Sequence, residues 1–383
     1  MRKGLIAASL GLLASAVIVT SGLARSEASA TPAQLAACTN VSLGFLGPLT
    51  GPAAFLGQEQ ISWLRFGAQK YNKAEGTQFK VAAGDTQLKA PVARTVARRF
   101  VSDASILSVI GGSESQAVRV SGNLFEKAQL ASVSGSATAV DLTKGHPYTT
   151  FFRVVPHDGI QGPQIVAFVA RNLKAKNVVV IDSQDDYSLP LASGVSRGLR
   201  ARNVNVERES VSADDTDFSS VVANVSDDVD VVVFATQVAP AANTLSQQLR
   251  EQGKKAIVFG TDGAYSPSQF KPRTGYVSVF APDLHFDPKA RALIREYNRY
   301  SKNKAFGSFG PATYQAGLVA MNAIRQSCAD GQTTRAEVVT FVRRTRIPSI
   351  FGGTVRFSRV GDPLPTRFVI YKIANGKYSP TTG

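Results

Sequence analysis

The sequence predicts an α/β protein of two doubly wound lobes, each with a parallel central sheet. Three observations lead to this fold class. The chain has 383 residues, too many for one compact core, so two domains are expected. Short apolar runs of strand length alternate with segments of helical period. The alternation starts again near the middle of the chain without a low-complexity linker, which favours lobes joined by several chain crossings.

The first cycle begins with a strand and then a helix whose residues Ile61, Leu64 and Ala68 share one apolar face. A second helix is expected around Val92–Val101. Short bounded runs of this kind are typical of strands buried on both faces of a parallel sheet. The strand candidates are Val41–Leu46, Phe79–Ala83, Ile106–Ile110 and Ala131–Val133.

The second cycle follows a strand at Phe151–Val154, and we expect Gly162-Pro163 to open its first helix. The strands of a second parallel sheet are predicted at Val178–Ile181, Val231–Phe234 and Ala256–Phe259. The last third of the chain predicts three helices. The first covers Asp287–Ser301, the second ends at Cys328, and the third begins at the capping box of Thr334 and Glu337. It also predicts strands at Phe351–Phe357 and Arg367–Ile373.

The N-terminus has the pattern of a secretory signal peptide, residues 1–30. Arg2 and Lys3 precede the apolar run Leu5–Leu23, and the small residues Ala28-Ser29-Ala30 follow. The alternative is a membrane anchor, but the run barely reaches the length that a bilayer needs. We therefore expect export to the periplasm or cell envelope.

The chain contains two cysteines, Cys38 and Cys328. In an oxidising compartment such a pair predicts a disulfide. The alternative is a lipid anchor, because Leu35-Ala36-Ala37-Cys38 resembles a lipoprotein cleavage box. The box does not directly follow the apolar run, so the disulfide is the favoured interpretation.

Composition and motifs argue against nucleic-acid binding and catalysis. The net charge is +15, but the Lys and Arg residues are dispersed and lack interleaved aromatic residues, as on a solvated surface. The sequence has no phosphate loop, no nucleophile elbow and no zinc motif. His146, His157 and His285 lie far apart and beside Pro or Asp. We therefore predict no enzyme, cofactor or metal site, and an envelope enzyme is a distant alternative.

Polar residues follow the predicted strands at their carboxyl ends, where open parallel sheets bind ligands. Hydroxyl-rich loops with Ser113, Ser115, Ser136 and Thr138 come after two strands of the first sheet. A glycine-rich loop that opens a helix suits a carboxylate, although Ser113 or Ser115 could instead cap that helix. In the second lobe, loops carry Tyr187 and Asp262, which suit an apolar group and an ammonium. Together they predict a zwitterion site, unless Asp262 only stabilises a turn.

In order and spacing, these motifs resemble those of the type I periplasmic solute-binding proteins of ABC transporters, in particular the branched-chain amino-acid binding group. The resemblance covers residues 41–378 and depends on several short motifs rather than one. The motifs are Gly47-Pro48-Leu49-Thr50-Gly51-Pro52, Asp85-Thr86-Gln87, Ile110-Gly111-Gly112-Ser113-x-Ser115, Ser134-Gly135-Ser136-Ala137-Thr138-Ala139, Phe152-Arg153-x-x-Pro156-x-Asp158-x-x-Gln161-Gly162, Asp186-Tyr187, Thr216-Asp217-Phe218 and Gly260-Thr261-Asp262-Gly263.

The resemblance implies that Ser115 binds the ligand carboxylate. Ser136 and Thr138 would contact both carboxylate and ammonium. Asp262 would take the ammonium, and Tyr187 would cover the ligand. Gln237 and Phe309 would lie near the ligand side chain.

The sequence also departs from the family pattern near the ligand side chain. Relatives often have an aromatic residue at Leu56, Tyr at Gln237 and Pro at Gly135. The polar Gln237 argues against a purely aliphatic ligand.

The resemblance further implies a type I periplasmic binding protein fold, with two Rossmann-like lobes joined by a three-crossing hinge. Lobe 1 would comprise residues 41–156 and 284–358, and lobe 2 residues 157–283 and 359–383. The implied function is that of the substrate-binding protein of an ABC importer, with a small molecule and the transporter permease as partners. The membrane would be reached only through the permease or a lipid anchor. The alternative is a sensory receptor of the same fold for an amide, a urea-like compound or an aromatic acid.

Overall fold

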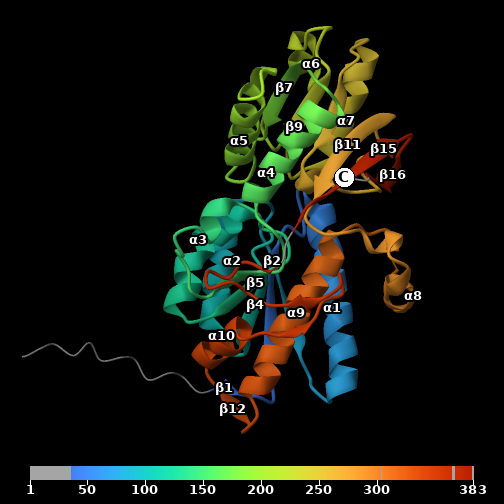
Figure 1. The fold of residues 1–383 in the computed structure, drawn as a ribbon. Helices are drawn as coiled ribbons and strands as arrows, with labels where there is room; N and C mark the ends of the chain where they lie inside the picture. The colour runs from blue at the N-terminus through green and yellow to red at the C-terminus, as the bar shows by residue number, and fades with distance from the viewer. Residues whose placement is uncertain (1–35, 303, 365–366, 382–383) are drawn as a thin grey trace, which may run out of the picture. The chain divides into compact units, whose positions relative to one another are not determined.

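The computed structural model describes residues 36–302, 304–364 and 367–381 (Figure 1). The predicted signal peptide, residues 1–30, lies outside these ranges. Within them, no helix combines the length and the apolar character needed to cross a bilayer.

The first half of the chain forms a five-stranded sheet in the order β3-β2-β4-β5-β6, and every neighbouring pair is parallel. All five strands predicted from the apolar runs are confirmed, with ends that differ by one or two residues. Their bounds are β2 Ser42–Gly47, β3 Lys80–Asp85, β4 Ile106–Gly111, β5 Ala131–Ser134 and β6 Phe151–Arg153.

Helices cover both faces of this sheet because its strands are apolar on both sides. One face packs against α1 (Ala54–Glu75), α9 (Phe309–Ser327) and α10 (Arg335–Arg343), with Phe45, Leu64 and Met321 in a shared core. The other face packs against α2 (Ala90–Ser102) and α3 (Ser115–Lys127). The predicted capping box is present, since Thr334 and Glu337 satisfy each other's backbone amides at the start of α10.

The second sheet has seven strands in the order β16-β15-β11-β10-β9-β7-β8. The bounds are β7 Asn177–Asp182, β8 Asn205–Ser210, β9 Val231–Ala235, β10 Ile257–Gly260, β11 Thr274–Val279, β15 Val369–Ala374 and β16 Lys377–Pro380. The three strands predicted for this sheet, β7, β9 and β10, are parallel to one another as expected. At one edge the sheet is antiparallel, because β15 pairs antiparallel with β11 and with β16. Asn375 and Gly376 both have positive φ and form the two-residue turn of an antiparallel hairpin.

Alternate residues of the inner strand β7 pack in different cores. Val179 and Ile181 pack toward α6 (Ser219–Asn224) and α7 (Ala239–Glu251). Val178 and Val180 pack on the opposite face, toward α4 (Asp158–Ala167) and α5 (Ser188–Arg200). This two-sided burial explains the continuous apolar runs in the sequence.

Three predicted elements differ from the structure. Helix α4 begins at Asp158 rather than at Gly162-Pro163, because the His157 ring accepts the amide of Gly159 and caps the helix earlier. A π-helical turn, η2 (Phe168–Asn172), completes it.

The predicted strand Phe351–Phe357 is reduced to β14 (Thr354–Val355), which pairs with β13 (Ile347–Pro348). The positive φ of Gly352 and Gly353 interrupts the extended backbone. The helix predicted from Asp287 begins only at α8 (Arg291–Tyr300), after the 3₁₀ turns η4 (Leu284–Phe286) and η5 (Pro288–Ala290). The Asp287 side chain accepts the amide of Lys289 there and stabilises the tighter turn.

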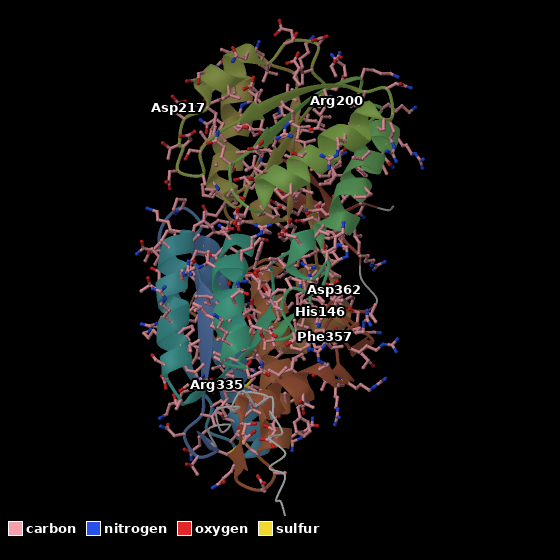
Figure 2. All side chains as sticks on the ribbon, turned by 90° about the vertical axis from the view of Figure 1, so that its left-hand side faces the viewer. His146, Arg200, Asp217, Arg335, Phe357 and Asp362 are labelled. Atoms are coloured by element: carbon pink, nitrogen blue, oxygen red, sulfur yellow. A yellow bond between two sulfur atoms is a disulfide. The ribbon has the colours of Figure 1, made fainter. Side chains whose placement is uncertain are left out.

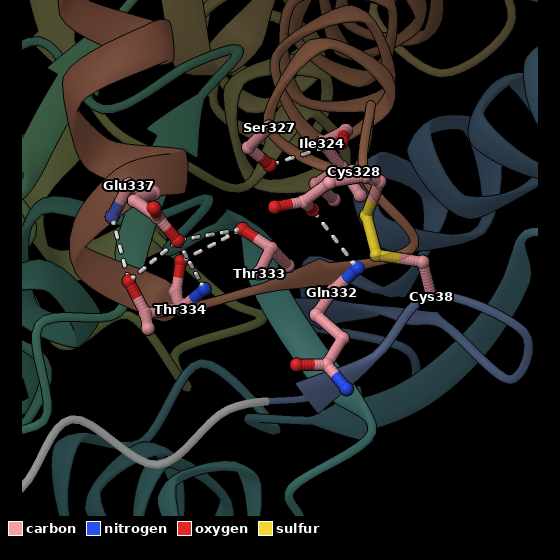
Figure 3. Close-up of a disulfide and its surroundings, with 9 residues drawn as sticks. Cys38, Ile324, Ser327, Cys328, Gln332, Thr333, Thr334 and Glu337 are labelled. Atoms are coloured by element: carbon pink, nitrogen blue, oxygen red, sulfur yellow. Dashed lines mark hydrogen bonds between the residues drawn. A yellow bond between two sulfur atoms is a disulfide. The ribbon is translucent and has the colours of Figure 1, made fainter.

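The two cysteines form the predicted disulfide, Cys38–Cys328, with a Cα–Cα distance of 5.9 Å (Figure 3). It joins the segment before β2 to the C-terminal end of α9. Beside it, the short strands β1 (Ala36–Ala37) and β12 (Gln332–Thr333) pair antiparallel. In this state the Cys38 sulfur is bonded to Cys328 and is not available for a lipid.

Candidate ligand-binding site

A buried cavity lies where the carboxyl ends of strands from the two sheets come together. It contains about 340 Å³ of space outside protein atoms, solvent at its mouth included. Loops after β4, β5, β7, β9 and β10 contribute to it, together with α1 and the start of α9. The lining residues are Pro48, Leu56, Gln60, Ser113, Glu114, Ser115, Ser136, Tyr187, Gln237, Asp262, Gly263 and Phe309.

The cavity brings together seven of the eight residues predicted to bind a ligand. The exception is Thr138, which is buried but is not among the lining residues. Its backbone carbonyl instead accepts the amide of Asp158, at 2.8 Å, and so holds the start of α4. The contact predicted for the Thr138 hydroxyl therefore has no counterpart in the lining of this cavity.

The start of α3 supplies hydrogen-bond donors to the cavity. No side chain caps this helix, so neither Ser113 nor Ser115 has the capping role that was the alternative interpretation. The Ser115 hydroxyl accepts the amide of Ala139 at 3.2 Å and donates to no described residue. The first-turn amides of an uncapped helix are also free to donate, and the helix dipole places partial positive charge there. This end of the cavity suits an anionic group.

The other two predicted serines have their hydroxyl protons engaged within the protein. Ser113 donates to the carbonyl of Leu46 at 3.1 Å. Ser136 donates to the carbonyl of Ser113 at 2.7 Å and accepts from Gln60 Nε2 at 2.8 Å. The Ser113 hydroxyl thus fixes its loop to β2, and the Ser136 hydroxyl fixes the loop after β5 to the loop after β4. Of the three predicted serines, only Ser115 keeps a hydroxyl proton for a ligand.

The opposite side of the cavity is acidic. The Tyr187 hydroxyl donates to Asp262 Oδ1 at 2.5 Å and lies 2.7 Å from the hydroxyl of Thr261, which can donate to it. Only 2% of Asp262 is exposed, and this burial raises the pKa of its carboxyl to about 6, although the bond from Tyr187 opposes the shift. Gln161 and the backbone amide of Asp262 are further hydrogen-bond donors to this carboxyl. A carboxylate has about four lone-pair sites, so it can still accept from a cation.

A further carboxyl lies near Asp262. Asp158, the first residue of α4, is buried, and burial followed by the nearby charge of Asp262 raises its pKa. A hydrogen-bonding interaction with the Thr138 side chain opposes this rise. No group of three or more His, Cys, Asp or Glu side chains in the described part of the chain is arranged to hold a metal ion.

Two glycines allow the cavity loops to pack closely. A Cβ atom on Gly263 would lie 2.3 Å from the carbonyl oxygen of Thr236, in the loop after β9. A Cβ atom on Gly135 would lie 2.8 Å from the amide nitrogen of Thr313, in α9. Any larger residue would therefore force these loops apart, which explains the glycine in each motif.

A fully buried arginine supports the loop after β5. Arg153 donates to the carbonyls of Ala137 and Ala139, at 3.2 and 2.8 Å, and to Asp362 Oδ1 at 2.7 Å. Asp362 belongs to the segment before β15, beside Phe357 (Figure 2). Because Ala139 also bonds to Ser115, Arg153 indirectly positions the donor end of the cavity.

Polar contacts connect the first sheet's helix α3 to loops of the second sheet. Arg119 forms a two-pronged ion pair with Asp141, at 2.7 and 2.8 Å, and also donates to the carbonyl of Asp186 at 2.9 Å. One turn earlier, Gln116 accepts from Gln237 at 3.3 Å. These contacts lie next to the cavity and involve only side chains or loops, so they can break without disrupting either sheet.

Comparison with known protein families identifies the chain. The family model of the periplasmic binding proteins matches residues 40–377. The chain belongs to this family. Periplasmic binding proteins bind solutes and are not enzymes, in agreement with the prediction from the missing catalytic motifs.

Individual relatives agree with this periplasmic binding protein assignment. A leucine-, isoleucine-, valine-, threonine- and alanine-binding protein of Pseudomonas aeruginosa is 23% identical over 344 residues, 88% of this chain and 90% of the relative. The substrate-binding protein LivJ of Streptococcus pneumoniae, solved with isoleucine, has a TM-score of 0.76 at 21% identity and covers 89% and 98% of the two chains. A fatty acid transporter substrate-binding protein of Thermomonospora curvata has a TM-score of 0.79 at 18% identity and covers 90% and 91%. At such identities the solved structures show the fold alone.

Two polar residues of this periplasmic binding protein's cavity were not predicted from the sequence, Gln60 and Glu114. Gln60 lies on the buried face of α1, four residues from both Leu56 and Leu64, where an apolar residue is expected. Glu114 lies between the two predicted serines and is only 2% exposed. A polar residue in an apolar helical stripe was the available signal for Gln60, whereas nothing in the sequence distinguished Glu114 from a solvent-exposed acid.

Proposed function

We propose that this chain is the substrate-binding protein of an ABC importer and that it binds an α-amino acid in the cavity. The supporting observation is that an uncapped helix start with a free serine hydroxyl and a buried carboxylate line the same cavity. An α-amino acid carries the complementary pair of charges on one carbon. Ser115 and the amides of α3 would bind its carboxylate, and Asp262 would bind its ammonium.

Tyr187 would orient Asp262 rather than bind the ligand's charges. Its hydroxyl proton is engaged by the Asp262 carboxylate, so its ring is the part available to the ligand. Leu56 and Phe309, which also line the cavity, would contact the ligand's carbon chain.

Binding would proceed by hinge closure of two lobes, residues 41–156 with 284–358 and residues 157–283 with 359–383. The membership of the two sheets supports these boundaries, because residues 42–153 build one sheet and residues 177–279 with 369–380 build the other. Ligand groups held by loops of both sheets would stabilise the closed arrangement, together with the contacts of Arg119 and Gln116.

The partners would be the amino acid and the permease of the importer, in the periplasm or cell envelope after removal of residues 1–30. The disulfide supports export, because such bonds persist in oxidising compartments.

The test is a thermal-shift screen of the purified protein without residues 1–30 against the twenty amino acids, small amides, urea and aromatic acids. A ligand at a hundredfold excess over its Kd stabilises the folded state by about 2.7 kcal/mol, which raises the melting temperature measurably. The expected result is a shift with one class of α-amino acid and no shift with the same compounds lacking the amine. Shifts only with compounds that lack an amine would refute the role of Asp262.

A further inference from the structure

Two acceptor oxygens of the cavity residues have no partner in the protein. Glu114 accepts a hydrogen bond from the hydroxyl of Thr86 through Oε1, while its Oε2 has no partner among the described residues. Gln60 donates through Nε2 to Ser136, while its Oε1 also has none. Glu114 is 2% and Gln60 is 1% exposed, so water does not reach these side chains freely. Buried acceptors without donors are rare in native proteins and often belong to functional sites.

The charges of the cavity are also unbalanced. Its lining contains the carboxyls of Glu114 and Asp262, and among the described lining residues there is no Lys, Arg or His. A simple α-amino acid brings one ammonium, which Asp262 would bind, and one carboxylate, which the start of α3 would bind. Glu114 would then remain without a counter-charge.

A second cation on the ligand removes this imbalance, because it would compensate the charge of Glu114. Burial raises the pKa of Glu114 to about 7, an effect that the bond from Thr86 opposes, so the carboxyl can ionise near neutral pH when a cation arrives. The neighbouring lining residues Leu56 and Phe309 offer apolar surface for a methylene stem.

We infer that the ligand is an α-amino acid whose side chain carries a cationic nitrogen, which Glu114 Oε2 and Gln60 Oε1 bind. This inference depends on the proposed function, and it names the ligand class for the same cavity. Gln237 adds polar character to the same lining.

Matched ligand pairs test the inference on the unaltered protein. Lysine and norleucine, ornithine and norvaline, and 2,4-diaminobutyrate and 2-aminobutyrate differ within each pair mainly by the terminal amine. Dissociation constants are measured by calorimetry at pH 8. In at least one pair, the cationic member is expected to bind at least about tenfold more tightly.

The variant Glu114→Gln identifies the residue responsible. It retains the acceptor for Thr86 and removes the charge, so the ratio of the two dissociation constants should fall toward one, while the uncharged member binds as before or more tightly. Glu207→Gln, an exposed residue of β8, changes the protein charge equally and should leave the ratio unchanged.

The outcomes separate the inference from the proposed function. If leucine or norleucine binds tightly and no cationic member is preferred, the inference is wrong and the proposed function stands. The inference is also wrong if Glu114→Gln leaves a cationic preference intact. If no amino acid of any class binds, the proposed function itself fails.

Discussion

Replacement of Asp262 by Asn is expected to change ligand affinity and stability in opposite directions. Loss of the charge partner of a buried ammonium costs about 2–5 kcal/mol, which weakens binding of an amino acid by roughly 30-fold to several thousandfold. The ligand-free protein should nevertheless become more stable at pH 8, because the variant no longer buries an ionised carboxyl.

The stability gain follows from the pKa of Asp262, which burial raises from 3.8 to about 6. This shift corresponds to on the order of 3 kcal/mol, an upper bound because the variant also weakens the hydrogen bond from Tyr187. The destabilisation of the wild-type protein is fully present above pH 6 and disappears as the pH falls toward 3.8. The gain should therefore be seen at pH 8 and vanish near pH 4.

Urea unfolding at the two pH values measures the stability, and calorimetry measures the dissociation constant. Asp214→Asn, at an exposed position whose carboxylate forms no hydrogen bond among the described residues, is the matched control and should change neither. An Asp262→Asn variant that is less stable at pH 8 and binds an amino acid within twofold of wild type would refute the reasoning.

Three further changes test other parts of the structure. The unfolding free energy of the double variant Glu114→Gln, Asp262→Asn should depend less on pH between pH 8 and 5 than that of the wild type. In the wild type, both carboxyls become protonated as the pH falls through their raised pKa values, and this increases the unfolding free energy. Parallel pH profiles of the two proteins in urea unfolding would contradict this. Arg119→Met should weaken amino-acid binding, measured by calorimetry, about twofold to fivefold at low salt and less at 1 M NaCl. The reason is that salt screens the part-exposed ion pair of Arg119 with Asp141. A loss of affinity that does not depend on salt would show that this ion pair does not contribute to binding through its charge. Reduction of the disulfide Cys38–Cys328 should lower the unfolding free energy by about 2–5 kcal/mol and leave the dissociation constant within twofold. The disulfide lies near the start of β2, whereas the cavity lies beyond the carboxyl end of β2. A large loss of affinity would show that the disulfide and the cavity are coupled.

The sequence predicted the strands that have uninterrupted apolar runs and missed strands in which polar residues or glycine break the run. Strands such as β7 are apolar on both faces and appear as uninterrupted runs. The edge strand β8 reads Asn-Val-Glu-Arg-Glu-Ser, because its outer positions contact solvent and only Val206 is buried. Strand β11 was not predicted, because Gly275 and Ser278 interrupt its apolar residues. Ser278 is nevertheless buried, and its hydroxyl accepts a hydrogen bond from Gln161.

We expected the candidate site at the carboxyl ends of the strands, because the topology of a parallel sheet brings these ends together whatever the sequence of the loops. Side-chain direction within a loop was not predictable in the same way. Ser113, Ser115 and Ser136 have the same hydroxyl, yet only Ser115 keeps its proton for a ligand. Thr138 is another example, because it belongs to the same loop as Ser136 and yet is not among the lining residues.

The antiparallel strand β15 has a consequence for the way this protein is made. Its residues 369–374 complete the second sheet only after every other strand but β16 has been synthesised, and α9 and α10 are likewise needed to cover the first sheet. Neither sheet can therefore finish folding from a partial chain. A polypeptide that cannot complete its cores until its last residues are present stays unfolded for longer, which would suit the proposed export of this chain before it folds.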